Sequence, residues 1–345
     1  MKALFAHAAR DLRLEDCKEG APGPGQLRVK TAHGGICGSD LHYYNHGGFG
    51  SVRLREPMIL GHEISGIVSE TGPDTAGFAV GDLVAVSPSR PCTTCAECLR
   101  GHPSQCLNMR FYGSAMPFPH IQGAFRETLV VDAGQCVSAN GLSAAQAAMA
   151  EPLAVCLHAV RQPGEVLGKR VLVTGCGPIG VLTIAAARRA GAQEIIAVDI
   201  TDNTLGFAHA AGADKTINSH KDPKALTPYS HAKGSLDILF ECSGAPAALA
   251  SGIAALRPRG IAVQLGLSGD MPVPMMQVTA KELQLRGSFR FHEEFGLAIE
   301  LMQKGLISVD HLITHTFPLG RFDDAFETAC DREQAMKVQL EFAPC

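Results

Sequence analysis

Apolar and polar residues follow a β-like pattern over the first part of the chain. Residues 1–140 contain short apolar or alternating blocks between turns rich in Gly and Pro, and Ala-rich helical sequence begins near Ser143. The clearest blocks are QLRVKTAHGG, EISGIVSET, DLVAVSPS and FRETLVVD. This pattern predicts a β-rich domain.

A second pattern begins at about Gly168. Six apolar blocks, most of them followed by a helix-like segment, read RVLVTG, EIIAVD, DKTIN, LDILFECSG, IAVQLG and LQLRGS. This alternation is typical of a parallel sheet with crossover helices. After about Gly287, HEEFGLAIELMQKG predicts an amphipathic helix and AMKVQLEF a strand. We therefore expect an α/β fold in which a Rossmann-type, doubly wound sheet (151–287) is inserted into a β-rich domain (1–150 and 288–345).

Composition narrows the functional classes. A chain of 345 residues is too long for one compact core and suits two domains. Its net charge of -4 comes without any run of like charge, which disfavours nucleic acid or an anionic membrane as a partner. The start of the chain has neither a signal-peptide pattern nor ~18 uninterrupted apolar residues. We expect a cytoplasmic protein whose thiols stay reduced.

A glycine-rich loop follows the first strand of the predicted sheet. Its glycines have G-x-G-x-x-G spacing, open a helix, and precede a second strand that ends in Asp199. This context predicts a dinucleotide site, in which the pyrophosphate lies at the helix N-terminus and the carboxylate accepts hydrogen bonds from the ribose. The expected cofactor-binding residues are Gly175, Gly177, Pro178, Ile179, Gly180 and Asp199.

The sequence also bears on which dinucleotide binds. Asp199 would repel a 2′-phosphate, and no Arg or Lys lies between Ile200 and His209. NAD is therefore expected in preference to NADP, although one aspartate sets a preference and does not bar NADP.

Four of the 12 cysteines are clustered as C-x2-C-x2-C-x7-C. Four local thiolates suit a closed structural zinc site; reduced free thiols and an iron–sulfur cluster are the alternatives. The acidic balance disfavours a nucleic-acid-binding zinc ribbon. The expected structural zinc ligands are Cys92, Cys95, Cys98 and Cys106.

Cys37 and His62 each lie beside a glycine, in GGICGSDLHYY and LGHEISG. Alone they prove little, because a cysteine is usually a small buried apolar residue. Together with the cofactor loop and the four-cysteine segment, in this order and over essentially the whole length, they resemble the zinc-dependent medium-chain alcohol dehydrogenase family. The resemblance implies a GroES-like catalytic domain, an NAD-binding Rossmann domain, two zinc ions per subunit, and a homodimer or homotetramer.

The resemblance implies Cys37 and His62 as ligands of a catalytic zinc. Many alcohol dehydrogenases have a cysteine as third ligand, whereas the matching stretch here, AEPLAVCLHA, offers Glu151 and is similar to the sorbitol dehydrogenase branch. Glu63 is a further carboxylate beside the metal. Whether Glu63 or Glu151 would bind directly or through water stays open at this point.

The family's chemistry assigns roles to neighbouring residues. Zinc lowers the pKa of a bound alcohol, and the resulting alkoxide expels hydride to the nicotinamide. Ser39 and His42 match the family's proton relay, in which Ser passes the proton through the nicotinamide ribose to His. A histidine suits the outer position because its ordinary pKa is near neutral.

The substrate expected from the resemblance is a polyol or an acyclic sugar acid, and most specifically L-idonate, oxidised at C5 to 5-ketogluconate. Tyr43 would offer a hydroxyl group to such a chain. An aldonate carboxylate wants a cation, best an arginine. We expect Arg110 or His120 to contact the carboxylate and Arg290 to hold a hydroxyl.

Alternatives are a sorbitol or xylitol dehydrogenase, a more distant threonine dehydrogenase, and a structural relative without turnover. The presence of Cys37, Ser39 and His62 disfavours the last of these. The apolar segment GDMPVPMMQVTA, residues 269–280, lies where the family's subunit interface would fall.

Overall fold

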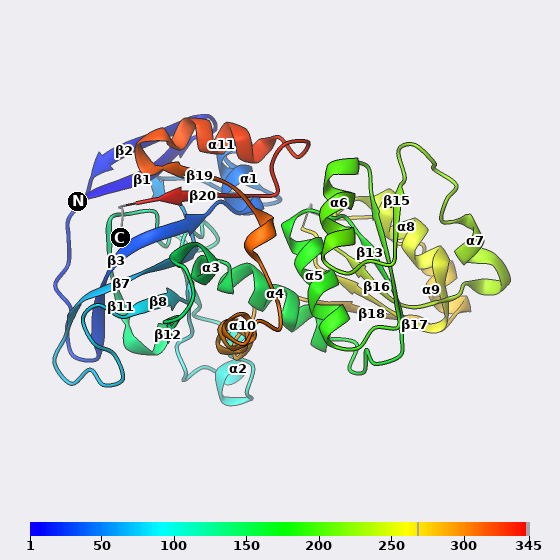
Figure 1. Ribbon diagram of the computed structural model, residues 1–345, viewed down its shortest axis with the longest axis horizontal. Helices are drawn as coiled ribbons and strands as arrows, with labels where there is room; N and C mark the ends of the chain where they lie inside the picture. Colours follow the sequence, from blue (N-terminus) through cyan, green and yellow to red (C-terminus); the bar gives the residue numbers. More distant parts are fainter. Residues whose placement is uncertain (268, 343–345) are drawn as a thin grey trace. The chain divides into compact units, whose positions relative to one another are not determined.

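The computed structural model describes residues 1–267 and 269–342, which form two compact units (Figure 1). Unit 1 contains Met1–Glu151, Phe295–Asp331 and the chain from Lys337 onward. Unit 2 contains Pro152–Glu294 and the short segment Arg332–Met336. The expected fold class, a β-rich domain with an inserted parallel α/β domain, is confirmed.

Unit 1 is built on a mixed sheet in which neighbouring strands follow the order β12-β8-β7-β3-β20-β19, with β11 also paired to β3. Helix α3 packs against β3, β7 and β8. The elements that form this sheet and its cover are β3 (Gln26–Gly35), β7 (Glu63–Thr71), β8 (Leu83–Val86), β11 (Thr128–Asp132), β12 (Cys136–Ser138), α3 (Ala144–Ala148), β19 (Ile313–Pro318), α11 (Phe322–Cys330) and β20 (Lys337–Glu341).

Smaller elements surround that sheet. They are β1 (Lys2–Ala8), β2 (Asp11–Asp16), α1 (Gly38–His46), β4 (Gly48–Phe49), β5 (Val52–Arg53), β6 (Met58–Ile59), β9 (Ser89–Arg90), α2 (Ala96–Leu99), β10 (Arg110–Phe111) and α10 (Glu294–Gln303). Helix α4 (Ala150–Arg161) begins in unit 1 and belongs to unit 2 from Pro152 onward. The four β-like blocks predicted in this region each contain an observed strand, and the predicted amphipathic helix and last strand are α10 and β20.

Unit 2 contains a parallel sheet of six strands in the order β15-β14-β13-β16-β17-β18. This is the doubly wound order, in which the chain starts at the centre and reverses direction once. Its elements are β13 (Arg170–Thr174), α5 (Pro178–Arg189), β14 (Glu194–Asp199), α6 (Asp202–Ala210), β15 (Lys215–Asn218), α7 (Thr227–Ser230), β16 (Leu236–Glu241), α8 (Pro246–Ala255), β17 (Leu256–Gln264), α9 (Met275–Ala280) and β18 (Gln284–Gly287). All six predicted strands are confirmed.

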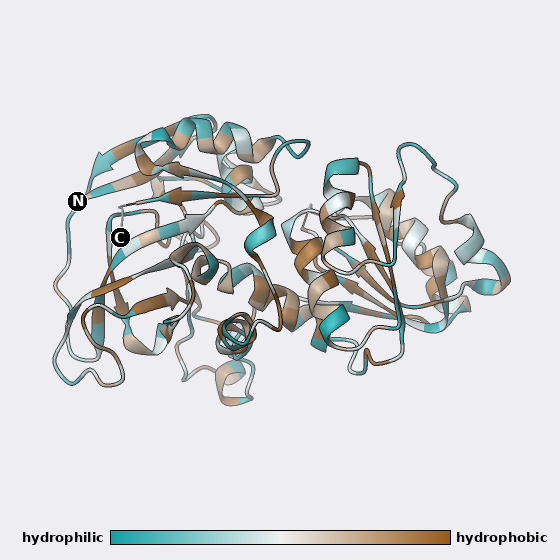
Figure 2. Cartoon of the chain, in the orientation of Figure 1, coloured by the Kyte–Doolittle hydropathy of each residue, from teal (hydrophilic) through white to brown (hydrophobic). Residues whose placement is uncertain are grey.

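The central strands of unit 2 are apolar along most of their length, as their brown colour in Figure 2 shows. In β13, Val171, Leu172 and Val173 are fully buried, which is expected of a strand covered by helices on both faces. Such continuous apolar runs explain why the sequence pattern located these strands.

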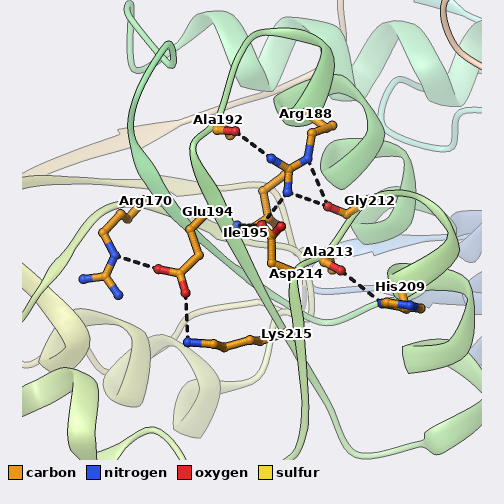
Figure 3. Close-up of polar contacts among 10 residues, drawn as sticks. All are labelled: Arg170, Arg188, Ala192, Glu194, Ile195, His209, Gly212, Ala213, Asp214 and Lys215. Carbon is orange, nitrogen blue, oxygen red and sulfur yellow. Dashed lines mark hydrogen bonds and ion pairs between the residues drawn. The ribbon is translucent and has the colours of Figure 1, made fainter.

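Charged residues begin three neighbouring strands of unit 2 (Figure 3). Glu194 accepts a hydrogen bond from Arg170 Nε at 2.7 Å and forms an ion pair with Lys215 Nζ at 2.9 Å. On the adjoining helix, Arg188 donates to the Gly212 carbonyl and pairs with Asp214. These contacts pair the charged residues at the amino ends of the strands. The cofactor loop lies at the opposite, carboxyl ends, where ligands bind in such sheets.

No helix in the described part of the chain combines the length and the apolar character needed to cross a membrane.

Candidate active site and zinc-binding lobe

Three strand ends in unit 1 bring the predicted zinc ligands together. Strand β3 pairs with β7 so that Gly35 faces Glu63, and Cys37 and His62 lie just beyond this pair. On its other side β3 pairs with β20, where Gly35 faces Gln339. As a result, one ligand atom each of Cys37, His62 and Glu63 lies within 4.8 Å of the others. The register of the sheet therefore assembles a compact thiol–imidazole–carboxylate cluster.

The carboxylate of Glu63 has a buried cationic partner. Lys337 Nζ lies 2.8 and 2.7 Å from its two oxygens and also donates to the Ile36 carbonyl at 3.3 Å. A Cβ atom at Gly35 would meet a Glu63 oxygen at 2.0 Å, so only glycine leaves room for this carboxylate. Our sequence reasoning missed Lys337; the available signal was a lysine within an otherwise apolar strand sequence.

Asp40 connects the two loops that carry the candidate ligands. Its carboxylate accepts the Cys37 N–H at 3.0 Å and the Gly61 N–H at 3.1 Å, and it lies 3.9 Å from His62 Nδ1. Metal-binding histidines usually rely on such an outer carboxylate for their orientation. Asp40 was also missed, although an acid three residues after a helix N-cap is a recognisable capping pattern.

Glu151 lies in the first turn of α4 and is 5% exposed. Helix α3, which leads to it, is held by Ser65 and Gln339 side chains that donate to the Ala144 and Ala145 carbonyls. Burial raises the pKa of Glu151 to about 8; His62 lowers it, while Glu63 raises it further. Cys37 and Lys337 act on Glu151 as well, so five titratable groups, including Glu151, influence one another in this region.

The donor set fits a zinc ion. Burial, followed by the nearby Glu63 charge, raises the pKa of the Cys37 thiol to about 12. The Nδ1 atom of His62 is buried and has no hydrogen-bond partner among the residues that the structure describes. A divalent cation would favour the thiolate and carboxylate forms that these surroundings disfavour. Thiolate, imidazole and carboxylate with one open position are the ligands of catalytic zinc sites.

Three predicted residues lie on α1, whose N-cap is Cys37. Ser39 and His42 are three positions apart and therefore share one face of the helix. Tyr43 is 2% exposed, and its hydroxyl accepts the Ala115 N–H at 3.0 Å. Through this bond Tyr43 holds the backbone at Ala115 next to α1, the helix that carries Ser39 and His42 of the proposed proton relay.

The four clustered cysteines form a second metal-type group. Cys95 Sγ lies 3.5 Å from Cys98 Sγ and 3.9 Å from Cys106 Sγ. A tetrahedron with 2.3 Å zinc–sulfur bonds has sulfur–sulfur edges of about 3.8 Å. The Cys92 sulfur accepts hydrogen bonds from Asn108 and from the Cys95 N–H, and these and other donors lower the pKa of Cys92 to about 5. Four converging sulfurs fit a closed zinc site.

The predicted substrate residues have different surroundings. His120 is 5% exposed; its Nδ1 lies 2.9 Å from the Pro117 carbonyl, and its Nε2 accepts the Arg55 N–H at 2.9 Å. Arg110 is exposed on the two-residue strand β10, next to Phe111, whose ring centroid lies 5.6 Å from that of His62. The structure thus brings Phe111 next to His62 of the cluster.

In unit 2, Arg290 has a left-handed backbone conformation, with φ of 59°, and its guanidinium lies 4.7 Å from the Phe289 ring centroid. A bulky residue with positive φ is uncommon, and such strained positions cluster at functional sites.

The glycine loop of unit 2 has the expected close approaches. Gly175 has φ of +83°, and a Cβ atom at Gly180 would meet the Gly175 carbonyl at 1.8 Å. Gly177 is the N-cap of α5, which begins with Pro178. The free N–H groups at this helix start suit a pyrophosphate. The predicted Ile179 occupies the second position of the same helix.

Asp199 ends β14 and binds three backbone groups. Its carboxylate accepts the Cys176 N–H at 2.6 Å, the Ile200 N–H at 2.7 Å and the Thr201 N–H at 3.0 Å. These bonds fix the acid beside the glycine loop, where it would meet the adenosine ribose.

A cation that the sequence did not reveal lies at this loop. A Cβ atom at Gly177 would meet Arg332 Nη1 at 2.7 Å, so the guanidinium lies against the start of α5. Arg332 belongs to the short segment in which the chain returns to unit 2, 155 positions beyond Gly177. No local sequence pattern predicts such a return.

Comparison with known proteins agrees with this site. The model of the alcohol dehydrogenase GroES-like domain matches residues 23–141, and that of the zinc-binding dehydrogenase domain matches residues 178–304. L-idonate 5-dehydrogenase (NAD(P)(+)) of Escherichia coli (strain K12) is 41% identical over 316 residues, which cover 91% of each chain. Sorbitol dehydrogenase of Homo sapiens is 32% identical over 349 residues, covering 99% of this chain and 96% of that one.

Solved structures give the same picture. The crystal structure of L-idonate 5-dehydrogenase from Escherichia coli matches with a TM-score of 0.95 and 38% identity, covering 99% of this chain and 98% of that one. That of 2R,3R-butanediol dehydrogenase from Bacillus subtilis matches with a TM-score of 0.87 and 29% identity, covering 99% of both chains. The fold, both family models and these identities lead to one conclusion: the chain belongs to the zinc-dependent medium-chain alcohol dehydrogenase family, in its polyol dehydrogenase branch.

Proposed function

We propose that the protein oxidises a secondary hydroxyl of an acyclic sugar acid, namely L-idonate at C5 to give 5-ketogluconate, with NAD as the preferred hydride acceptor. The observation that carries the dehydrogenase proposal is the buried cluster of Cys37, His62 and Glu63 in a chain that also has a dinucleotide loop. The 41% identity to L-idonate 5-dehydrogenase supports the choice of substrate.

The chain's own residues would divide the work in unit 1. Bound zinc would supply a Lewis acid for the substrate hydroxyl, and bound NAD would accept the hydride. Cys37 and His62 would hold the metal with a carboxylate from Glu63 or Glu151. Ser39 would accept the hydroxyl proton, and His42, on the same face of α1, would release it to solvent.

Lys337 bears on which glutamate binds the metal. Both oxygens of Glu63 already contact Lys337. Glu63 could therefore bind zinc directly only if one carboxylate oxygen contacted the metal and Lys337 at the same time. Among the described residues Glu151 forms no ion pair, although the Lys337 charge lowers its pKa from a distance. We propose Glu151 as the alternative third ligand, acting directly or through water. Zinc analysis of Glu63→Gln and Glu151→Gln proteins would separate the two, because the true ligand's removal should lower the zinc content.

In unit 2, the chain would hold the cofactor's pyrophosphate at the start of α5 with Arg332 as a counter-charge, and its ribose at Asp199. A 2′-phosphate would meet the Asp199 carboxylate, which supports the preference for NAD. We therefore expect the protein to turn over NADP more slowly than NAD, but still to accept it.

The carboxylate of L-idonate should be read by a cation. Arg110, His120 and Arg290 are our candidates. His120 contacts two backbone groups, and the alternation of side chains along β10 points Arg110 away from the side on which Phe111 contacts His62; both observations count against these two residues. If Arg110 reads the carboxylate nonetheless, Arg110→Ala will lose more kcat/KM on L-idonate than on a neutral polyol.

The second candidate function is a sorbitol- or xylitol-type dehydrogenase, favoured by the 32% identity to human sorbitol dehydrogenase over 99% of this chain. The test is a turnover screen with NAD and NADP against L-idonate, D-gluconate, 5-ketogluconate, sorbitol, xylitol and L-threonine. We expect the highest kcat/KM for L-idonate with NAD. Faster turnover of sorbitol would favour the polyol enzyme. No turnover, with only one zinc per chain, would favour a structural relative.

We also propose a homodimer or homotetramer. The segment 269–280 exposes apolar side chains, since Met275 is 55% and Met276 84% exposed. Every residue of the neighbouring strand β18, which ends the sheet, is exposed. An exposed apolar edge of this kind is a natural pairing surface. Light scattering of the purified protein would test the assembly.

A further inference from the structure

Unit 1 contains a cavity of about 300 Å³ that none of the proposed zinc ligands or proton-relay residues lines. Its wall is formed by β10, the beginning of β11 and the segments around residues 18–20, 90 and 120–122. The charged or hydrogen-bonding residues that line it are Lys18, Arg90, Arg110, Tyr112, His120, Gln122, Arg126 and Thr128. The volume is at the small end of ligand pockets and suits a small metabolite better than a dinucleotide.

The cavity is basic in a protein that is acidic as a whole. Four of its lining residues are Lys or Arg and none is Asp or Glu, whereas the chain has 30 basic and 34 acidic residues. Arg90 pairs with Asp132 at 2.6 Å. Within residues 1–267 and 269–342, no carboxylate makes an ion pair with Lys18, Arg110 or Arg126. Three of the four cations therefore lack an ion-pair partner among these residues, and the nearby Glu19 carboxylate accepts a hydrogen bond from Thr128 in the wall at 3.0 Å.

Two arginines lie directly opposite one another in this wall. Strand β10 pairs with β9 so that Arg110 faces Arg90. Like charges in directly opposed positions of an antiparallel pair are destabilising. Behind them, Arg126 is partly buried, donates through Nε to the Gly123 carbonyl at 2.9 Å, and has its pKa lowered by that burial. An anion in the cavity would offset both the repulsion and the desolvation.

The cavity is separate from the zinc cluster. Adjacent residues of a strand point to opposite faces, so Arg110 points away from the side on which Phe111 contacts His62. None of the proposed catalytic zinc ligands, and neither Ser39 nor His42, lines the cavity. Thr128, in its wall, pairs with Lys30, five residues before Gly35 at the end of β3 that precedes Cys37.

The four-cysteine lobe restrains Arg110, one of the exposed arginines of the cavity. The Asn108 N–H donates to Cys106 Sγ at 3.3 Å, and the Met109 N–H donates to the Cys106 carbonyl at 3.2 Å. Arg110 follows immediately. A zinc ion in the lobe would therefore restrict where Arg110 can place its guanidinium.

We propose that this cavity is a binding site for a small oxyanion, the carboxylate or phosphate group of a metabolite, separate from the site of hydroxyl oxidation. Arg110 and Arg126 are its principal ligands, because guanidinium groups bind carboxylate and phosphate through paired hydrogen bonds. Tyr112 and Lys18 complete the wall. The proposal concerns binding alone and does not depend on which alcohol the protein oxidises.

Isothermal titration calorimetry of the full-length, zinc-loaded protein tests it, with inorganic phosphate and D-gluconate as probes at constant ionic strength in chloride. We expect saturable binding of at least one probe and at least tenfold weaker binding to Arg110→Gln and Arg126→Gln. Arg100→Gln is the matched control, because Arg100 is an exposed lobe arginine paired with Glu97. If Arg126→Gln does not fold, the exposed Arg110 still decides the question.

The outcomes separate the alternatives. Phosphate binding alone indicates a phosphate ester as ligand, and gluconate binding alone a sugar acid; either supports the site. Binding that is absent, or equal in wild type and Arg110→Gln, overturns it. Cys37→Ser should retain the binding, and its loss there would place the anion in the catalytic cluster and overturn the proposal. Failure of the substrate screen leaves this binding result unaffected.

Discussion

Lys337 Nζ lies 2.8 and 2.7 Å from the two carboxylate oxygens of Glu63, and both side chains are almost completely buried, at 2% and 1% exposure. The burial of Lys337 opposes its charged form, but Glu63 and Cys37 outweigh this effect and raise the pKa of Lys337. A buried pair of this kind costs most when one partner is removed, because the other charge then has no compensation.

Replacing Lys337 by Met should therefore destabilise the protein by about 4 kcal/mol, measured as the free energy of unfolding in urea. The double variant Lys337→Met/Glu63→Gln should recover part of this loss, since it removes the orphaned charge. Lys304→Gln is the control: Lys304 forms an exposed i,i+4 pair with Glu300, and its loss should cost less than about 1 kcal/mol. A Lys337→Met protein as stable as this control would contradict the prediction.

Losing the zinc of the four-cysteine group and losing the zinc of the Cys37–His62 group should affect the protein differently. Cys98→Ser should lower the zinc content from about two to about one per chain and reduce thermal stability, because a closed thiolate site contributes folding energy. Cys37→Ser should remove the other zinc and lower kcat by about 10³-fold or more while the circular dichroism spectrum is preserved. Elemental analysis and kinetics measure both. The same loss of stability in the two variants would contradict this division.

Arg332→Ala should weaken NADH binding about tenfold, because a charge-assisted contact to the pyrophosphate would be lost. NADH fluorescence titration measures this without turnover. The control is Arg259→Ala, since Arg259 is an exposed unit 2 arginine whose only described ion pair is a 4.0 Å contact with Glu282. Equal dissociation constants for the two variants would remove Arg332 from the cofactor site.

Glu294 should make the free energy of unfolding depend on pH in the acidic range. Burial alone would raise its pKa, but hydrogen bonds from His158 and from the His292 N–H prevail and lower the pKa to about 2. Its folded pKa is below the unfolded value of about 4.3, so its contribution is present above pH 4.3 and is lost as the pH falls toward 2. Glu294→Gln should be less stable than wild type by about 2 kcal/mol at pH 7.

That difference should narrow between pH 4.3 and 2, as urea unfolding at several pH values would reveal. Glu300→Gln, an exposed helical control, should show a small and constant difference. A Glu294→Gln difference that does not change with pH would contradict the assignment.

The six strands of unit 2 could be predicted from sequence because each is a short apolar run, as expected where helices cover both faces of a sheet. The zinc-type clusters could be predicted because their ligands lie in short motifs. Lys337 could not be assigned, since its role depends on the register between β3 and β20, residues about 300 positions apart. Arg332 reaches the glycine loop only because the chain returns briefly to unit 2.

The sequence also did not predict the directions in which the candidate side chains point. Arg110 and Phe111 are adjacent in sequence, yet one lines the basic cavity and the other contacts His62. His120 was a reasonable cation candidate, but its ring contacts two backbone groups. A two-residue strand and a folded loop decide these directions, and neither has a periodic pattern that a sequence could reveal.

The origin of the cluster in three distant strand ends has a consequence for synthesis. Cys37, His62 and Glu63 emerge from the ribosome early, whereas Lys337 emerges after all of unit 2. Until then β3 lacks β20 on one side, and the Glu63 carboxylate has no buried cation beside it. Since Cys37, His62, Glu63 and Glu151 all precede unit 2, the nascent chain carries every candidate metal ligand well before it carries the cation that compensates Glu63.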